Sequence, residues 1–178
     1  MKTISLTLIT LLLSMKLPAA QAGDRDIFDA ARANDAVRVK QLIAEHVNID
    51  KPGADGFTPL ILAAYSGSPE VVEVLLANHA NVHVGSRMGN ALMAASFQGY
   101  AEIVKQLLKA GARVNDTNQA GGTALMFAAL SGRTQVIQLL IANGAQVNKR
   151  DSRGLDAAML AEQQGNQELA DMLRKASK

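Results

Sequence analysis

The chain has 178 residues, of which 48% are hydrophobic and 3% are aromatic, and the sequence contains no cysteine. The absence of cysteine excludes disulfides, thiol catalysis and a lipid anchor attached to cysteine. Two of the 18 basic residues, Lys2 and Lys16, lie in the N-terminal segment, and the other 16 balance 16 acidic residues, so we expect neither nucleic acid nor anionic lipid as a partner.

Residues 1–22 have the pattern of a secretory signal peptide. Lys2 provides a positive start, residues 4–13 are largely apolar, and small residues end the segment. We expect cleavage after Ala22, so that the mature chain begins at Gly23 in the periplasm or outside the cell. The alternative is an uncleaved membrane anchor, but the apolar run is shorter than the roughly 20 residues that span a bilayer.

One spacing organises the rest of the chain. Five short helices are expected to begin around apolar residues 33, 32, 33 and 33 positions apart: Ile27, Leu60, Leu92, Leu125 and Ala158. Four of these residues are followed at a distance of seven by a glycine: Gly67, Gly99, Gly132 and Gly165. Self-similarity at this period predicts a solenoid of stacked units.

Local signals predict two helices in each unit. The first helix should begin after an N-cap residue, at Thr58, Asn90, Thr123 or Asp156. A second helix should begin near Pro69, Ala101, Thr134 or Gln167. It carries a Leu/Ile pair on its apolar side, and we expect both members, such as Leu107 and Leu108, to be buried. Met93, Met126 and Met159 share one repeat position, which favours packing between units.

The motifs resemble those of the ankyrin-repeat family. The second unit contains Asp55-Gly56-Phe57-Thr58-Pro59-Leu60 and Ala63-Ala64, and the fourth ends Asn143-Gly144-Ala145-Gln146-Val147-Asn148. The resemblance implies an all-α repeat solenoid in which each unit is a helix-turn-helix with a hairpin tip. We expect one domain over 23–178 with about five units, at 24–53, 54–85, 86–118, 119–151 and 152–178. The first and last units should be polar caps that complete the array.

The resemblance also implies a non-enzymatic protein-binding module, in which hairpin tips and the exposed side of the first helices hold a partner. Transferred to this chain, the candidate partner-binding residues are Phe57, Tyr65, Arg87, Phe97, Leu130 and Arg153. Tyr65, Phe97 and Leu130 share one repeat position and are expected to form a ladder along the concave face. We expect a monomer with no cofactor, no metal and no catalytic residue.

Several roles fit such a module. We expect an exported accessory factor that supports or inhibits a partner protein, for example a periplasmic enzyme such as a catalase. An immunity protein that neutralises a toxin is an alternative. A third reading is an enzyme or metal site at His79 and His83 with Glu45 or Asp50, but the two histidines straddle a turn and have no obvious further ligand.

Charge is distributed unevenly along the array. Residues 24–86 contain five basic and nine acidic residues, whereas residues 87–178 contain eleven basic and seven acidic ones. The alternatives are a gradient that orients a partner and a solvated surface without a role.

Overall fold

The computed structural model describes residues 20–177, with side chains from residue 26 onward. The predicted signal peptide therefore lies almost entirely outside the described residues. Within the described range the chain forms ten α-helices: α2 (Ala20–Arg32), α3 (Ala36–Ala44), α4 (Pro59–Ser66), α5 (Pro69–Ala77), α6 (Ala91–Gln98), α7 (Ala101–Lys109), α8 (Ala124–Leu130), α9 (Thr134–Ala142), α10 (Ala157–Gln163) and α11 (Gln167–Ala176).

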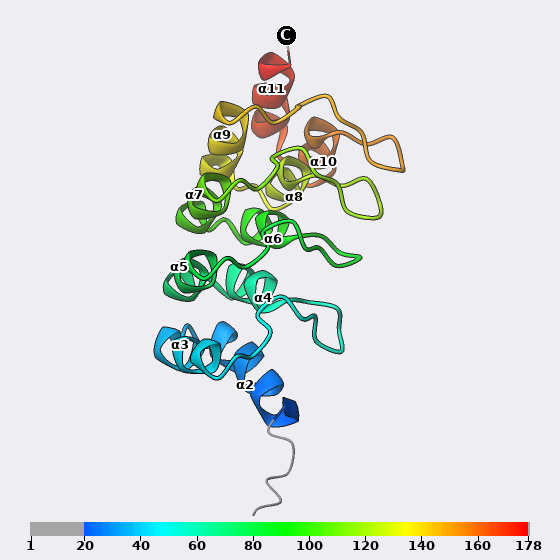
Figure 1. Ribbon diagram of the computed structural model, residues 1–178. Helices are drawn as coiled ribbons and strands as arrows, with labels where there is room; N and C mark the ends of the chain where they lie inside the picture. Colours follow the sequence, from blue (N-terminus) through cyan, green and yellow to red (C-terminus); the bar gives the residue numbers. More distant parts are fainter. Residues whose placement is uncertain (1–19, 178) are drawn as a thin grey trace, which may run out of the picture.

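The helices form two layers of a solenoid (Figure 1). Helices α2, α4, α6, α8 and α10 contact one another in succession and make the inner layer, while α3, α5, α7 and α9 stack beside them as the outer layer. Hairpins project from the side of the inner layer opposite the outer helices. The all-α repeat solenoid predicted from the sequence is confirmed, and none of the described helices combines the length and hydropathy needed to cross a membrane.

Four hairpins carry the turns between units, and we number them by the unit that they begin. They are tip 2 (53–57), tip 3 (86–89), tip 4 (118–122) and tip 5 (151–155), each closed by a backbone hydrogen bond between its first and last residues. In tips 2, 4 and 5 this bond spans five residues, whereas in tip 3 it joins the Ser86 N–H to the Gly89 carbonyl at 2.8 Å and spans four. Tip 3 is thus one residue shorter, which accounts for the single spacing of 32.

The inner helices begin and end where the sequence predicts. Each of the four predicted N-cap side chains accepts a hydrogen bond from the backbone N–H three residues later: Thr58, Asn90, Thr123 and Asp156. Helices α4 and α6 end at Gly67 (φ 73°) and Gly99 (φ 89°) in left-handed conformations that glycine adopts cheaply. These signals fix the length of each helix independently of its neighbours.

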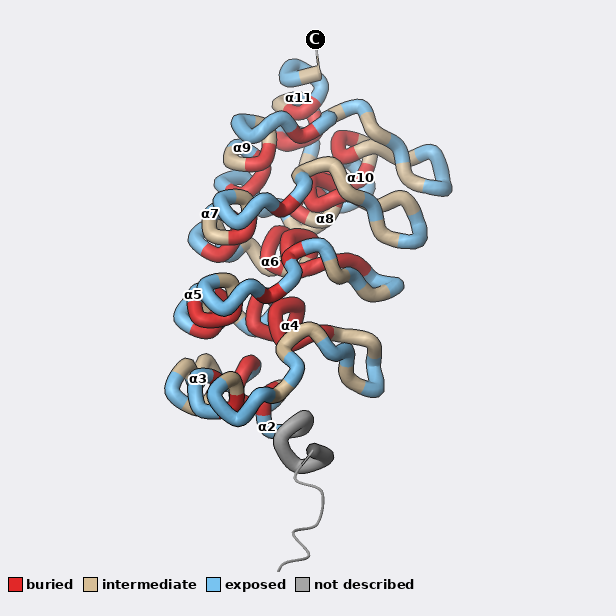
Figure 2. The backbone as a smooth tube through the Cα atoms, viewed as in Figure 1, coloured by how far each residue is buried: buried red, intermediate tan, exposed pale blue. Residues whose placement is uncertain are grey.

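The core runs continuously along the array between the two layers. Figure 2 shows that the buried residues follow the inner helices and the inward sides of the outer helices. The alanine at one repeat position is fully buried in each of the last four inner helices: Ala63, Ala95, Ala128 and Ala161. Because these side chains are small, neighbouring helices approach closely, and each unit contributes to a core that no unit could form alone.

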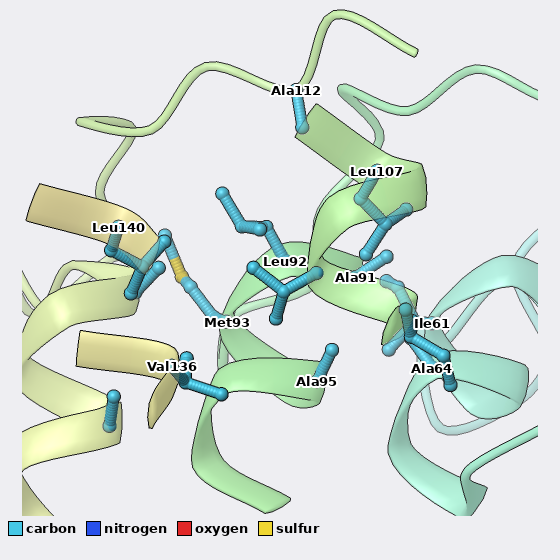
Figure 3. Packing of buried hydrophobic residues seen from close by; sticks show 14 of the residues in the cluster. Ile61, Ala64, Ala91, Leu92, Met93, Ala95, Leu107, Ala112, Val136 and Leu140 are labelled. Carbon is cyan, nitrogen blue, oxygen red and sulfur yellow. The ribbon is translucent and has the colours of Figure 1, made fainter. Parts of the chain in front are cut away.

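The prediction that both members of each Leu/Ile pair are buried is wrong. Leu107 is fully buried, with no exposed area, whereas Leu108 is half-buried and packs at the edge of the core. In Figure 3 the side chain of Leu107 points into the cluster that contains Leu92. Successive residues of an α-helix point about 100° apart, and α7 is rotated so that Ile103, Val104 and Leu107 face the core while Leu108 lies at the edge of the same face.

Polar side chains join successive units at the turns that follow the outer helices. Asp50 Oδ1 accepts the backbone N–H of Asn81 at 2.8 Å, and the equivalent Asn115 Oδ1 accepts that of Gln146 at 2.8 Å. Near the first unit, Asn34 Oδ1 accepts the N–H of Val71 at 3.3 Å. These bonds satisfy backbone donors across the unit boundaries and help to fix the register of the stack.

Candidate functional site

An open groove of about 620 Å³ lies on the inner face, between tips 2 and 3. Its floor comes from α4 and α6, and one end is closed by Arg32 of α2 and the other by Phe127 of α8. Most of the side chains around it are apolar. The lining residues are Arg32, Asp55, Phe57, Ile61, Leu62, Tyr65, Ser66, Ser86, Met88, Gly89, Asn90, Met93, Ala94, Phe97 and Phe127.

The structure brings together half of the predicted partner-binding residues. Phe57, Tyr65 and Phe97 all line the groove, although they come from tip 2, α4 and α6 respectively. Tyr65 is 50% exposed, which is unusual for so large an apolar side chain in this array. The three aromatic side chains therefore line one groove.

The other three predicted residues lie outside the groove lining: Leu130, Arg87 and Arg153. Leu130 is half-buried and packs against the core at the end of α8. Arg87 lies on tip 3 but its Nε donates to Gln119 of tip 4 at 3.1 Å. Of the predicted ladder through Tyr65, Phe97 and Leu130, the groove lining contains the first two; Tyr65 is exposed, whereas Phe97 and Leu130 are half-buried.

Phe97 differs from Tyr65 because a second ring covers it. The rings of Phe97 and Phe127 meet edge to face, with centroids 6.3 Å apart and planes at 81°. Such aromatic pairs contribute roughly 0.5–1.5 kcal/mol beyond the area that they bury. Phe97 thus stabilises the contact between α6 and α8 as well as lining the groove, whereas Tyr65 is free to contact a partner.

Tip 5 is held by its own ion pair. Asp151 Oδ1 accepts the backbone N–H groups of Leu155 and Arg153, and its Oδ2 accepts the Arg153 guanidinium at 2.8 Å. The hydrogen bond from Leu155 and then those from Arg153 lower the pKa of the Asp151 carboxyl below its usual value. Arg153 therefore supports its own hairpin, which lies beyond tip 4 and outside the groove between tips 2 and 3.

Sequence reasoning missed the methionine contribution to the groove. Met88 at the apex of tip 3 is 69% exposed, and Met93 is buried beneath the same tip, where its sulfur would lie 2.6 Å from a Cβ added to Gly89. The sequence signal that tip 3 differs from the other hairpins is the shortened spacing before Leu92.

The charged residues at the groove form a small cluster at its α2 end. The Arg32 guanidinium lies 3.3 Å from Asp29 and 3.8 Å from Asp55. All three side chains are between 46% and 80% exposed, so these are weak surface pairs. Two carboxylates share one guanidinium, which leaves this end of the groove with a net negative charge.

The histidines serve backbone geometry rather than a visible site. His46 and His79 have φ values of 62° and 63°, at the position where Gly111 and Gly144 have 90° and 83°. His83 stands at the repeat position where Asp50 and Asn115 accept their hydrogen bonds. Within residues 20–177, no group of three or more His, Asp or Glu side chains is arranged to hold a metal ion.

Comparison with known proteins identifies the repeat. A family model described as ankyrin repeats (3 copies) matches residues 27–118 and again 92–178. Ankyrin repeat and SAM domain-containing protein 6 of Rattus norvegicus is 39% identical over 94 residues, which is 50% of this chain and 10% of the relative.

Two further relatives have different printed names. The E3 ubiquitin-protein ligase KEG of Arabidopsis thaliana is 31% identical over 110 residues, and the mitochondrial disaggregase of Homo sapiens is 33% identical over 76 residues. These matches cover 59% and 43% of this chain. The chain spans only 7% and 11% of those two proteins, so the similarity concerns a small part of each.

Proposed function

The chain belongs to the ankyrin-repeat family, and we propose that it acts as a non-enzymatic module that holds another protein at the groove between tips 2 and 3. The observation that carries the proposal is the gathering of Phe57, Tyr65 and Phe97 around one open groove. Aromatic side chains at the centre of an interface are the residues that most often dominate its binding energy. Tyr65 also offers a hydroxyl, so that it can contact apolar and polar groups of a partner together.

The relatives support a binding role rather than a catalytic one. Proteins named as a ubiquitin ligase and as a disaggregase match this chain only over a small part of their length. The matched segment is therefore common to proteins whose named activities differ. A shared array of this kind fits a module that recognises partners while other domains carry the chemistry.

Site-specific crosslinking in cells that carry the gene tests this proposal. A photoreactive phenylalanine analogue at position 65 should capture one predominant protein. The same analogue at Gln138, which is exposed on the outer helix α9, serves as the matched control and should not capture that protein. Capture from position 138 but not from position 65 would place the binding surface on the outer helices and contradict the assignment to the groove.

We further propose that the module works after export, as a monomeric accessory factor that supports or inhibits an exported protein. The support is the sequence of residues 1–22, whose positive start, apolar run and small terminal residues are typical of a cleaved signal. N-terminal sequencing of the protein recovered from cells should begin at Gly23. Recovery of a chain that begins at Met1 would contradict export by cleavage.

A further inference from the structure

We propose that the groove receives a bulky apolar side chain from a partner segment in which a cationic residue lies nearby, and that the shortened tip 3 opens the groove for it. This inference rests on the proposed function, and it defines the chemistry of the partner. It depends on three features of the described residues: the geometry of tip 3, the apolar lining, and the charge at the α2 end.

The first feature is the local deletion in tip 3. Gly89 has φ 142°, a conformation that favours glycine, and it stands at the repeat position where tips 2 and 5 have Phe57 and Leu155 and the full-length tip 4 has Gly122. A Cβ at Gly89 would lie 2.6 Å from the sulfur of Met93, so no side chain fits there without displacing Met93. The wall of the groove is therefore bare backbone at Gly89, in the same lining as Tyr65.

The second feature is the lining itself. The polar groups on the tip 3 side are already engaged, because Asn90 caps α6 at 3.1 Å and Ser86 Oγ donates to the Gly89 carbonyl at 3.0 Å. The surface left for a ligand is apolar, with the flexible Met88 at its rim. A volume of about 620 Å³ lies within the range of roughly 300–1,000 Å³ found for ligand pockets. One or two bulky side chains from a protein segment suit such an open site better than a polar ligand does.

The third feature is charge. Asp29 and Asp55 flank Arg32, which leaves one net negative charge at the α2 end of the groove. Residues 24–86, which supply eight of the fifteen lining residues, contain nine acidic and five basic residues. A lysine or arginine of the partner would find a favourable potential there and could pair with Asp55, which is half exposed. An acidic partner segment would be repelled at the same end.

A library of short random peptides displayed on phage or cells can be selected for binding to the full chain. This selection tests the proposed preference for an apolar side chain near a cationic one, and it does not require the partner protein itself. Peptides retained by the natural chain and not by its Tyr65→Ala variant should contain Leu, Met or an aromatic residue close to Lys or Arg. The Tyr65→Ala substitution should weaken the selected peptides roughly tenfold or more. The Val37→Ala variant is the control, since Val37 is 68% exposed on α3 away from the groove, and it should bind unchanged.

Two variants separate the contributions of charge and shape. Asp55→Asn should reduce the preference for basic over acidic peptides, while apolar peptides without charge keep their affinity. A glycine inserted between Met88 and Gly89 restores the five-residue hairpin of the other tips. It should weaken the peptides without a comparable loss of thermal stability.

Three outcomes would overturn the proposal. Enrichment of acidic peptides would contradict the assigned charge, and failure of any peptide to distinguish the natural chain from Tyr65→Ala would contradict the assigned site. Self-association in sedimentation that Tyr65→Ala abolishes would place a second copy of this chain in the groove instead. If position 65 still captures a partner in cells in any of these cases, the proposed function stands and only the partner chemistry is wrong.

Discussion

Replacement of two adjacent leucines in α7 should have very different effects on stability, although the chemical change is the same. Leu107 is fully buried at the interface between helices, so Leu107→Ala removes its methyl groups and leaves a cavity. Such substitutions typically cost about 2–5 kcal/mol. Leu108 is half-buried, and the loss of about half the transfer energy of a leucine corresponds to about 1 kcal/mol for Leu108→Ala.

Urea unfolding followed by circular dichroism measures the difference. With a slope of about 2 kcal/mol per M, Leu107→Ala should lower the midpoint by about 1–2.5 M and Leu108→Ala by about 0.5 M. The slope should remain constant, since a changed slope would show that the units no longer unfold together. An equal or larger shift for Leu108→Ala would refute the assigned orientation of α7 and, with it, the reasoning that only one member of each pair faces the centre of the core.

The Tyr65→Ala/Phe97→Ala double variant should bind the partner at least roughly a hundredfold more weakly. Its melting temperature should also fall, and Phe97→Ala alone should lower the melting temperature equally, whereas Tyr65→Ala alone should not lower it. Hydrogen peroxide should convert Met88, which is 69% exposed, to its sulfoxide well before Met126, which is 3% exposed; peptide mass spectrometry would detect the reverse order, which would contradict the exposure of tip 3. Because the pKa of the Asp151 carboxyl is lower in the folded than in the unfolded protein, its ionised form stabilises the fold. This contribution to the free energy of unfolding is complete above the ordinary pKa of about 3.9, and it is lost as the pH falls through the folded-state pKa. The Asp151→Asn variant should therefore show a smaller loss of urea midpoint between neutral pH and about pH 3 than the natural chain, and an equal loss in both would indicate that other carboxyls control acid unfolding.

Contacts between neighbouring units join the tips in the second half of the array. Tips 3, 4 and 5 are joined by hydrogen bonds between neighbours, since Asn118 donates to the Met88 carbonyl at 3.0 Å and the Ser152 N–H donates to the Ala120 carbonyl at 2.9 Å. The aromatic pair of Phe97 and Phe127 further ties α6 to α8. The basic half of the array is thus bound together through its tips, and the candidate binding surface spans the boundary between the acidic and basic halves.

The sequence by itself determined the fold of this protein, because the signals involved are local and repeated. A side chain that can cap a helix does so at Thr58 or Asp156 regardless of what packs nearby, and a glycine ends α4 through its own backbone preference. Repetition at a fixed period then determines the stacking, since each unit can bury its apolar side only against a copy of itself.

Only the tertiary structure decided which residues form the groove and which leucine of each pair is central. Leu107 and Leu108 are indistinguishable in the sequence, and their burial depends on the rotation of α7 about its axis. Tyr65 and Phe97 likewise occupy one repeat position, but the ring of Phe127 covers only the second. The difference between Tyr65 and Phe97 arises where neighbouring units are unlike each other, so it depends on a contact between residues 30 positions apart. A repeat pattern shows the residues that the units have in common, whereas the groove is formed by residues that differ between units.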